Sequence, residues 1–364
     1  MKKLRHFFMV LLVVVLATPM AGWAAKEAAA GEGKVPAATA GKEEGKPIKK
    51  ATTKEEGEPE GKEEAEEGEK KEEKEGKQEE AKEGECPATY GPIITDTAIP
   101  IEKGKFAIQP TFGLAFITNS LSPNWRRVSA GGNFKSFGMD WRFTYGLLNN
   151  LEVFVVLPYV HNWAGDVDKA LQGPQGERSA DFGGLCDINL TFKYRLVEEG
   201  PTKPTVTALF ATDFPSGHCK HLNPGLLGVD AVGGGAHVFT AGLNLSKYVK
   251  PFIFYGNFWY SMATDFTNDD GSQHPRDFVT VNLAAEYPIT KKWVALLELT
   301  SLWDGGRLIG HRANVAPGAL LSVMPGIEYM ATEKFSLALG VNVDLIGKNS
   351  AAAVTPLLSM VYAF

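Results

Sequence analysis

Residues 335–345 read FSLALGVNVDL, a stretch in which apolar side chains stand at every second position. Successive side chains of a β-strand point to opposite faces, so this spacing predicts a strand with one apolar face and one small or polar face. The same alternation recurs in residues 106–116, 137–145 and 188–196. The sequence therefore predicts an all-β protein built from two-faced strands.

Twelve such segments follow residue 104, and an even number is typical of bacterial single-chain outer-membrane barrels. The predicted strands lie near residues 105–118, 134–146, 151–161, 185–197, 204–214, 236–246, 251–263, 277–287, 293–302, 319–329, 335–346 and 353–364. This pattern predicts a transmembrane, antiparallel, up-and-down β-barrel of about 12 strands over residues 105–364.

The links between these segments alternate in length. Short links are predicted around residues 146–150, 198–203, 247–250, 288–292 and 330–334, and long links around 119–133, 162–184, 215–235, 264–276 and 303–318. Membrane barrels have short periplasmic turns and longer outer loops, because only a closed sheet satisfies every backbone group in hydrocarbon. An even strand count then places both termini on the periplasmic side.

Aromatic residues recur beside the short links, where an interfacial girdle of a membrane barrel is expected. They are Phe106, Tyr145, Tyr194, Phe252, Tyr287, Trp293, Tyr329 and Phe335. The chain ends with Leu358, Met360, Tyr362 and Phe364 at alternate positions. This ending resembles the signal by which the barrel assembly machinery of the outer membrane receives its substrates, which makes that machinery and outer-membrane lipid expected partners.

The part before the barrel divides into three segments. Residues 1–24 carry Lys2, Lys3 and Arg5 before a short apolar core, which predicts a cleaved export signal. Residues 25–85 include 18 Glu, 11 Lys and 7 Gly between Gly41 and Glu85, and this composition predicts a disordered, charged periplasmic tether. The tether is either a plain spacer, a partly helical rod, or the binding site for a periplasmic or cell-wall partner. Residues 86–104 form a leading segment that is either a plug, a periplasmic lid or the end of the tether.

Five short motifs indicate a family. The motifs are ITDTAIP (94–100), KGKF (103–106), GGLCDI (183–188), FKYRL (192–196) and FPSG (214–217). With these motifs, residues 90–364 resemble the outer-membrane β-barrel transporters associated with the meta-cleavage pathway of phenol degradation. The resemblance implies a transporter, with aromatic or hydrophobic compounds among its expected solutes. Cys186 stands where the family usually has Gly.

The sequence contains few residues in patterns typical of catalysis or metal binding. The histidines after the export signal lie in or next to the long links, and none has a Ser, Asp or Asn partner at a spacing typical of a catalytic site, so we expect no enzyme and no cofactor. His218, Cys219 and His221 are the one local group that could bind a metal, with a plain surface loop as the alternative. Cys186 and Cys219 could form a disulfide in an oxidising compartment. The near-neutral remainder excludes a basic nucleic-acid binder.

Alternation also places charged side chains on the predicted inner wall. They are Arg142, Lys193 and Arg195 in the early strands, and Glu286, Glu298, Glu328 and Asp344 in the later strands. These pore-lining candidates either create a transverse field that selects solutes or pair and brace a blocked lumen. We therefore expect passive or facilitated diffusion of small molecules across the outer membrane of a Gram-negative bacterium. The alternatives are a structural barrel whose acidic arm anchors it to an envelope partner, and a secretion barrel with the arm as cargo.

Overall fold

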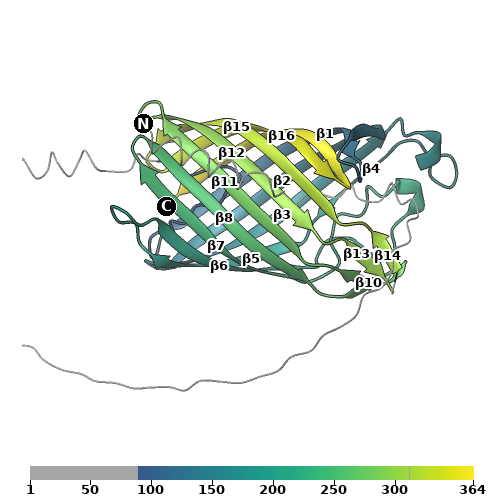
Figure 1. Cartoon of the computed structure of the whole chain (residues 1–364), viewed down its shortest axis with the longest axis horizontal. Helices are drawn as coiled ribbons and strands as arrows, with labels where there is room; N and C mark the ends of the chain where they lie inside the picture. Colours follow the sequence, from purple (N-terminus) through teal and green to yellow (C-terminus); the bar gives the residue numbers. More distant parts are fainter. Residues whose placement is uncertain (1–88, 311) are drawn as a thin grey trace, which may run out of the picture. The chain divides into compact units, whose positions relative to one another are not determined.

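The barrel wall is a single closed antiparallel sheet in this computed structural model, which describes residues 89–310 and 312–364. Twelve strands build the wall: β1 (Phe106–Leu121), β2 (Arg127–Leu148), β3 (Leu151–Gly165), β5 (Ile188–Val197), β6 (Thr205–Phe214), β7 (Val238–Val249), β8 (Phe252–Ala263), β11 (Phe278–Pro288), β12 (Trp293–Asp304), β15 (Gly318–Thr332), β16 (Phe335–Lys348) and β17 (Ser350–Ala363). Figure 1 shows these strands crossing obliquely. The all-β barrel prediction is confirmed. The export signal and the tether lie outside the described residues.

Pairing of the first strand with the last closes the sheet. β1 pairs with β17 in a register that places Phe112 opposite Leu358, and on its other side with β2, which places Gln109 opposite Arg142. β4 (Ala180–Leu185) pairs with the end of β3, and β5 continues the wall after an interruption of two residues. No helix among the described residues has the length and hydropathy needed to cross a membrane.

The predicted loops differ from the structure in two places. β1 extends to Leu121 and β2 begins at Arg127, so the long link predicted over residues 119–133 is wrong. The loops that follow β8 and β12 contain a separate four-stranded sheet, visible at the right of Figure 1. Its strands are β9 (Phe266–Asn268), β10 (Gly271–Pro275), β13 (Arg307–Ile309) and β14 (Arg312–Val315). Two 3₁₀ turns, η1 (Lys169–Leu171) and η2 (Pro224–Leu226), lie in the other long loops.

The wall exposes apolar side chains on its outer face and buries polar side chains on its inner face, which is the reverse of a soluble protein. Phe210, Phe258 and Leu339 point outward and are each more than half exposed, whereas Lys193 and Asn244 point inward and are fully buried. Glu286, Glu298 and Thr300 are fully buried as well. Because a soluble protein buries its apolar side chains and exposes its charges, this distribution matches an apolar solvent outside the wall.

Aromatic side chains gather at the short-turn end. The ring of Trp293 is tilted against that of Tyr329 with 4.6 Å between centroids, and the ring centroids of Phe252 and Tyr287 are 5.3 Å apart. At the seam, Phe364 contacts Tyr362 at 4.6 Å and Phe106 at 5.7 Å, and its backbone N–H donates to the Phe106 carbonyl. Leu358 and Met360 lie on the same strand, β17. Three residues of the predicted assembly signal, Leu358, Met360 and Tyr362, therefore lie on the closing strand, and Phe364 directly follows it. Their role in assembly stays a prediction.

Candidate functional site in the barrel lumen

Residues 89–104 follow the inner wall near the short-turn end, and we call them the lumen strap. The strap has no helix or strand, and Pro92 and Pro100 lie within it. The hydrogen bonds of its backbone reach β15, β12, β8, β7, β6, β3 and β2 in turn, so successive backbone contacts move backwards through the strand order of the wall. The strap therefore runs around the lumen before the chain enters β1.

Acidic side chains of the later strands hold the first part of the strap. Glu328 accepts hydrogen bonds from the Thr89 hydroxyl at 2.7 Å and from the Tyr90 backbone N–H at 3.3 Å. Glu298 accepts the backbone N–H groups of residues 93, 94 and 95 at 2.8, 3.1 and 2.6 Å. Burial, and then the neighbouring Glu328 carboxylate, raise the pKa of Tyr90, so its hydroxyl stays neutral. Two wall carboxylates thus replace the strand partners that these amides lack.

An apolar contact fixes the same part of the strap. Ile93 packs against Val294, Leu296 and Ala338. A Cβ added at Gly340 would lie 3.3 Å from the Cδ1 atom of Ile93, so glycine makes room for this side chain. Glu286 lies beside Glu328 in the same region and accepts a hydrogen bond from the Tyr255 hydroxyl at 2.9 Å.

Asp96 is the charged centre of the strap. Its carboxylate lies 3.1 Å from the Arg142 guanidinium and 3.0 Å from the Lys193 ammonium, and it accepts a hydrogen bond from the Asn244 side chain at 2.7 Å. The Asp96 backbone N–H donates to the side-chain oxygen of Asn257, and the Asn257 amide returns a bond to the Asp96 carbonyl. Although burial alone would raise the pKa of Asp96, the Lys193 and Arg142 charges lower it overall.

Glu152 completes this cluster. Its carboxylate lies 2.9 Å from the Lys193 ammonium and 3.4 Å from Arg142, and it accepts the Ile101 backbone N–H at 2.7 Å. The Arg142 guanidinium also lies over the Phe154 ring at 3.7 Å. The four charged groups Arg142, Lys193, Glu152 and Asp96 sum to zero only when the strap supplies Asp96.

The strap ends in a tight contact with the wall. The Ala98 N–H donates to the Ser246 hydroxyl at 2.8 Å, and the Thr207 hydroxyl donates to the Ala98 carbonyl. Farther along, the Gly104 N–H donates to the Gly146 carbonyl at 2.8 Å. A Cβ at Gly146 would lie 2.0 Å from the Glu102 carbonyl oxygen, so this position requires glycine.

The seven pore-lining candidates fall into two sets. Arg142, Lys193, Glu286, Glu298 and Glu328 gather around the strap, as described above. Asp344 lies apart and accepts hydrogen bonds from the Ser322 hydroxyl at 2.7 Å and the Ala353 N–H at 2.8 Å. Arg195 lies at the short-turn rim, 3.5 Å from Glu198. Sequence alternation alone missed Asp96, Asn244 and Asn257, whose role depends on where the strap lies.

The predicted metal candidates His218 and His221 have different neighbours in the structure. The His218 ring is tilted against that of Phe182 with 5.7 Å between centroids, whereas His221 extends into solvent with its Nδ1 atom 3.1 Å from the Asp269 carboxylate. No group of three or more His, Cys, Asp or Glu residues able to hold a metal occurs within residues 89–310 and 312–364. Cys186 and Cys219 are free thiols on segments that meet at Asp187, and their pairing stays a prediction. Burial raises the pKa of Cys219.

His274 contacts both an Asp and a Ser, which the sequence spacing did not reveal. His274 lies on β10 with its Nδ1 atom 2.8 Å from Asp265 and its Nε2 atom 3.4 Å from the Ser272 hydroxyl. A serine nucleophile is expected within about 2.6–3.2 Å of its base, so the serine contact is long. Asp265 and Ser272 are exposed.

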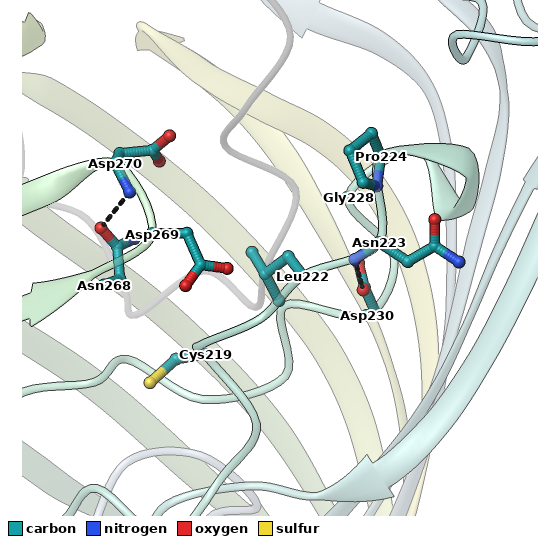
Figure 2. Close-up of a pocket in the computed structure, with 9 residues that line it drawn as sticks. All are labelled: Cys219, Leu222, Asn223, Pro224, Gly228, Asp230, Asn268, Asp269 and Asp270. Carbon is teal, nitrogen blue, oxygen red and sulfur yellow. Dashed lines mark hydrogen bonds between the residues drawn. The ribbon is translucent and has the colours of Figure 1, made fainter.

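A pocket of about 240 Å³ lies among the long loops, between the loop that contains Cys219 and Asp230 and the hairpin turn at Asp269 and Asp270. Figure 2 shows Asp269 and Asp270 on one side of the pocket and Asn223 and Asp230 on the other. The Asn223 N–H donates to Asp230 at 2.7 Å, and the other Asp230 carboxylate oxygen has no hydrogen-bond partner within the described part of the chain.

No protein-family model and no curated protein matches this chain. Its fold is similar to that of an outer-membrane channel from Pseudomonas putida F1, with a TM-score of 0.61 and 15% identity over 76% of this chain and 100% of that chain. The translocator domain of the autotransporter NalP from Neisseria meningitidis gives a TM-score of 0.43 and 13% identity over 80% of this chain and 95% of that chain. The CymD monoaromatic hydrocarbon channel gives a TM-score of 0.36 and 11% identity over 72% of this chain and 89% of that chain. The first likeness shows the fold, and the other two are too distant to carry an argument.

Proposed function

We propose that this chain is an outer-membrane channel of a Gram-negative bacterium through which small molecules diffuse without catalysis. The observation that carries this proposal is the polarity of the wall, with apolar side chains outside and polar or ionisable side chains inside. A wall of this kind suits a protein with lipid around it and water within it. The similar fold of an outer-membrane channel is consistent with this role.

The lumen strap is the selective part of the proposed channel. Barrels of about eight strands are filled by their own side chains, and those of about sixteen or more enclose an aqueous channel. Twelve strands therefore leave a narrow lumen, and a chain segment along its wall narrows it further. The strap acts as a constriction at the short-turn end, held by charges at Asp96, Glu298 and Glu328.

Orientation, partners and substrate complete the proposal. The short-turn end, where the strap enters β1 and the chain ends, faces the periplasm, and the export signal and charged tether precede it. The resemblance to transporters associated with phenol degradation favours aromatic or hydrophobic solutes. The assembly machinery takes the role of folding partner through Leu358, Met360, Tyr362 and Phe364.

Conductance in planar lipid bilayers tests the channel. The purified full chain should give discrete openings, and deletion of residues 89–100 should increase the conductance of each opening, because the deletion removes the constriction. The matched control replaces the exposed Asp270 in the β9–β10 hairpin with Ala and should conduct like the unmodified chain. A folded barrel that is silent with and without the strap would contradict the channel and favour a structural barrel that anchors the envelope.

A further inference from the structure

We propose that the wall around Asp96 is a receptor for small carboxylates, and that Asp96 is a resident ligand which a solute carboxylate displaces. This inference deepens the proposed channel function, because it names a solute class for the lumen. It rests on the way in which one carboxylate of the strap is bound by three side chains of the wall.

The donors of the site all belong to the wall. Arg142 from β2, Lys193 from β5 and Asn244 from β7 approach the two oxygens of Asp96 at 3.1, 3.0 and 2.7 Å. Ionised donors form shorter and stronger hydrogen bonds to carboxylates than neutral donors do. The ligand, Asp96, belongs to the strap and not to the wall, so the wall retains all three donors when the strap is absent.

The donors are also held in place by groups other than Asp96. The Asn244 side-chain oxygen accepts hydrogen bonds from the Trp259 indole at 2.8 Å and from Asn257 at 3.0 Å, which directs its amide nitrogen toward the carboxylate. Glu152 binds Lys193 and Arg142, and Phe154 lies beneath the guanidinium. A site that is organised in this way binds its ligand at a lower entropic cost.

The net positive charge of the wall residues at this site favours the binding of an anion. Lys193 is fully buried, and Arg142, Lys193 and Glu152 together carry one excess positive charge. An unpaired buried charge is strongly unfavourable, so release of Asp96 requires another anion in its place. A small carboxylate has the charge and the two oxygens that the site receives from Asp96.

Exchange of the two carboxylates couples solute binding to the strap. A solute that binds only after Asp96 has left shifts the population toward the released strap. The Asp96 backbone contacts to Asn257 are then no longer supported by the ion pairs. A carboxylate solute therefore widens the constriction that it passes.

The test removes the resident ligand and adds a free one. Purified, folded Asp96→Ala protein should be stabilised against thermal unfolding by acetate and by benzoate, with an acetate affinity roughly tenfold or more above that of the unmodified chain. Acetamide, which is neutral and similar in size, should have no effect. The double variant Asp96→Ala/Lys193→Met, which lacks the excess charge, should not respond to acetate, and Asp270→Ala should respond like the unmodified chain.

A second measurement uses the unmodified chain and does not depend on the folding of a variant. Acetate should accelerate amide hydrogen exchange of residues 93–98, and acetamide should not. Equal responses to acetate and acetamide, or no response in either measurement, would overturn the carboxylate site. A barrel that is silent in bilayers but binds acetate in the Asp96→Ala variant contradicts the channel alone, whereas a conducting barrel without acetate binding contradicts the site alone.

Discussion

At the scale of single residues, Asp96 is the position on which the lumen depends most. Its carboxylate neutralises a wall that otherwise carries excess positive charge, and its backbone is bonded to Asn257 on both sides. Breaking a buried ion pair by removing one partner costs about 3–5 kcal/mol. Replacement of Asp96 by Asn should therefore weaken the attachment of the strap by about that amount, since Arg142 and Lys193 remain charged.

The same residue predicts a dependence on pH. Lys193 and Arg142 hold the pKa of Asp96 below its ordinary value of 3.8. A depressed pKa means that the ionised carboxylate stabilises the attached strap above pH 3.8, and that this contribution is lost as the pH falls through the lowered pKa. Amide exchange of residues 93–98, corrected for the intrinsic effect of pH, should differ between the unmodified chain and Asp96→Asn at pH 7 and converge at strongly acidic pH. A difference that persists unchanged in acid would contradict this assignment.

At the scale of elements, the junction between the strap and β1 tolerates no added side chain at Gly146. The Cβ of Gly146→Ala would meet the backbone of Glu102 at 2.0 Å, and a backbone atom cannot move aside as a flexible side chain can. We expect Gly146→Ala to lower the free energy of unfolding by about 1–3 kcal/mol through overpacking, and to loosen the strap. Thermal unfolding and protease cleavage of the strap measure both effects.

A matched control for this junction is Gly200→Ala. Gly200 lies in another short turn, where an added Cβ meets no atom within 4 Å, so this variant should unfold like the unmodified chain. Equal stability of the two variants would contradict the described approach of the strap to β2.

The alternation of apolar side chains predicts the strands of the barrel but not the contacts between the strap and the wall. Strand positions such as 335–348 follow from a local period of two, which depends only on neighbouring residues and on which face meets lipid. The partners of Glu298 are backbone amides 203 to 205 residues away in sequence, and no local pattern specifies such a pairing. Lys193, Glu298 and Glu328 are buried in the structure, and the role of the predicted inner-wall charges as pore lining stays a prediction. Asp96, the partner of Arg142 and Lys193, lies in a segment with no periodicity. The small sheet of β9, β10, β13 and β14 was missed because its strands are short and pair across two loops.

At the scale of the whole barrel, closure depends on the seam between β1 and β17. Phe364 caps this seam through its ring contacts with Phe106 and Tyr362 and through its N–H bond to Phe106. Phe364→Ala should reduce the fraction of closed barrel formed in cells several-fold. The control is Phe116→Ala, which removes an exposed ring from β1 at a position far along the strand from Phe106, and this variant should not reduce that fraction. Gel migration with and without boiling measures the closed fraction, since a closed barrel resists unfolding by detergent at room temperature. Equal fractions in both variants would contradict a special role for the last residue.

The circular path of the strap determines how tension would act on it. Thr89 is attached to β15, and the later backbone hydrogen bonds of the strap are made to strands successively farther back around the barrel. A force applied upstream of Thr89 would load the Glu328 contacts first, then those of Glu298, and only afterwards those of Asp96. The attachments of the strap would thus break one after another, starting at Thr89. Each of these steps would need far less force than the simultaneous rupture of all the attachments.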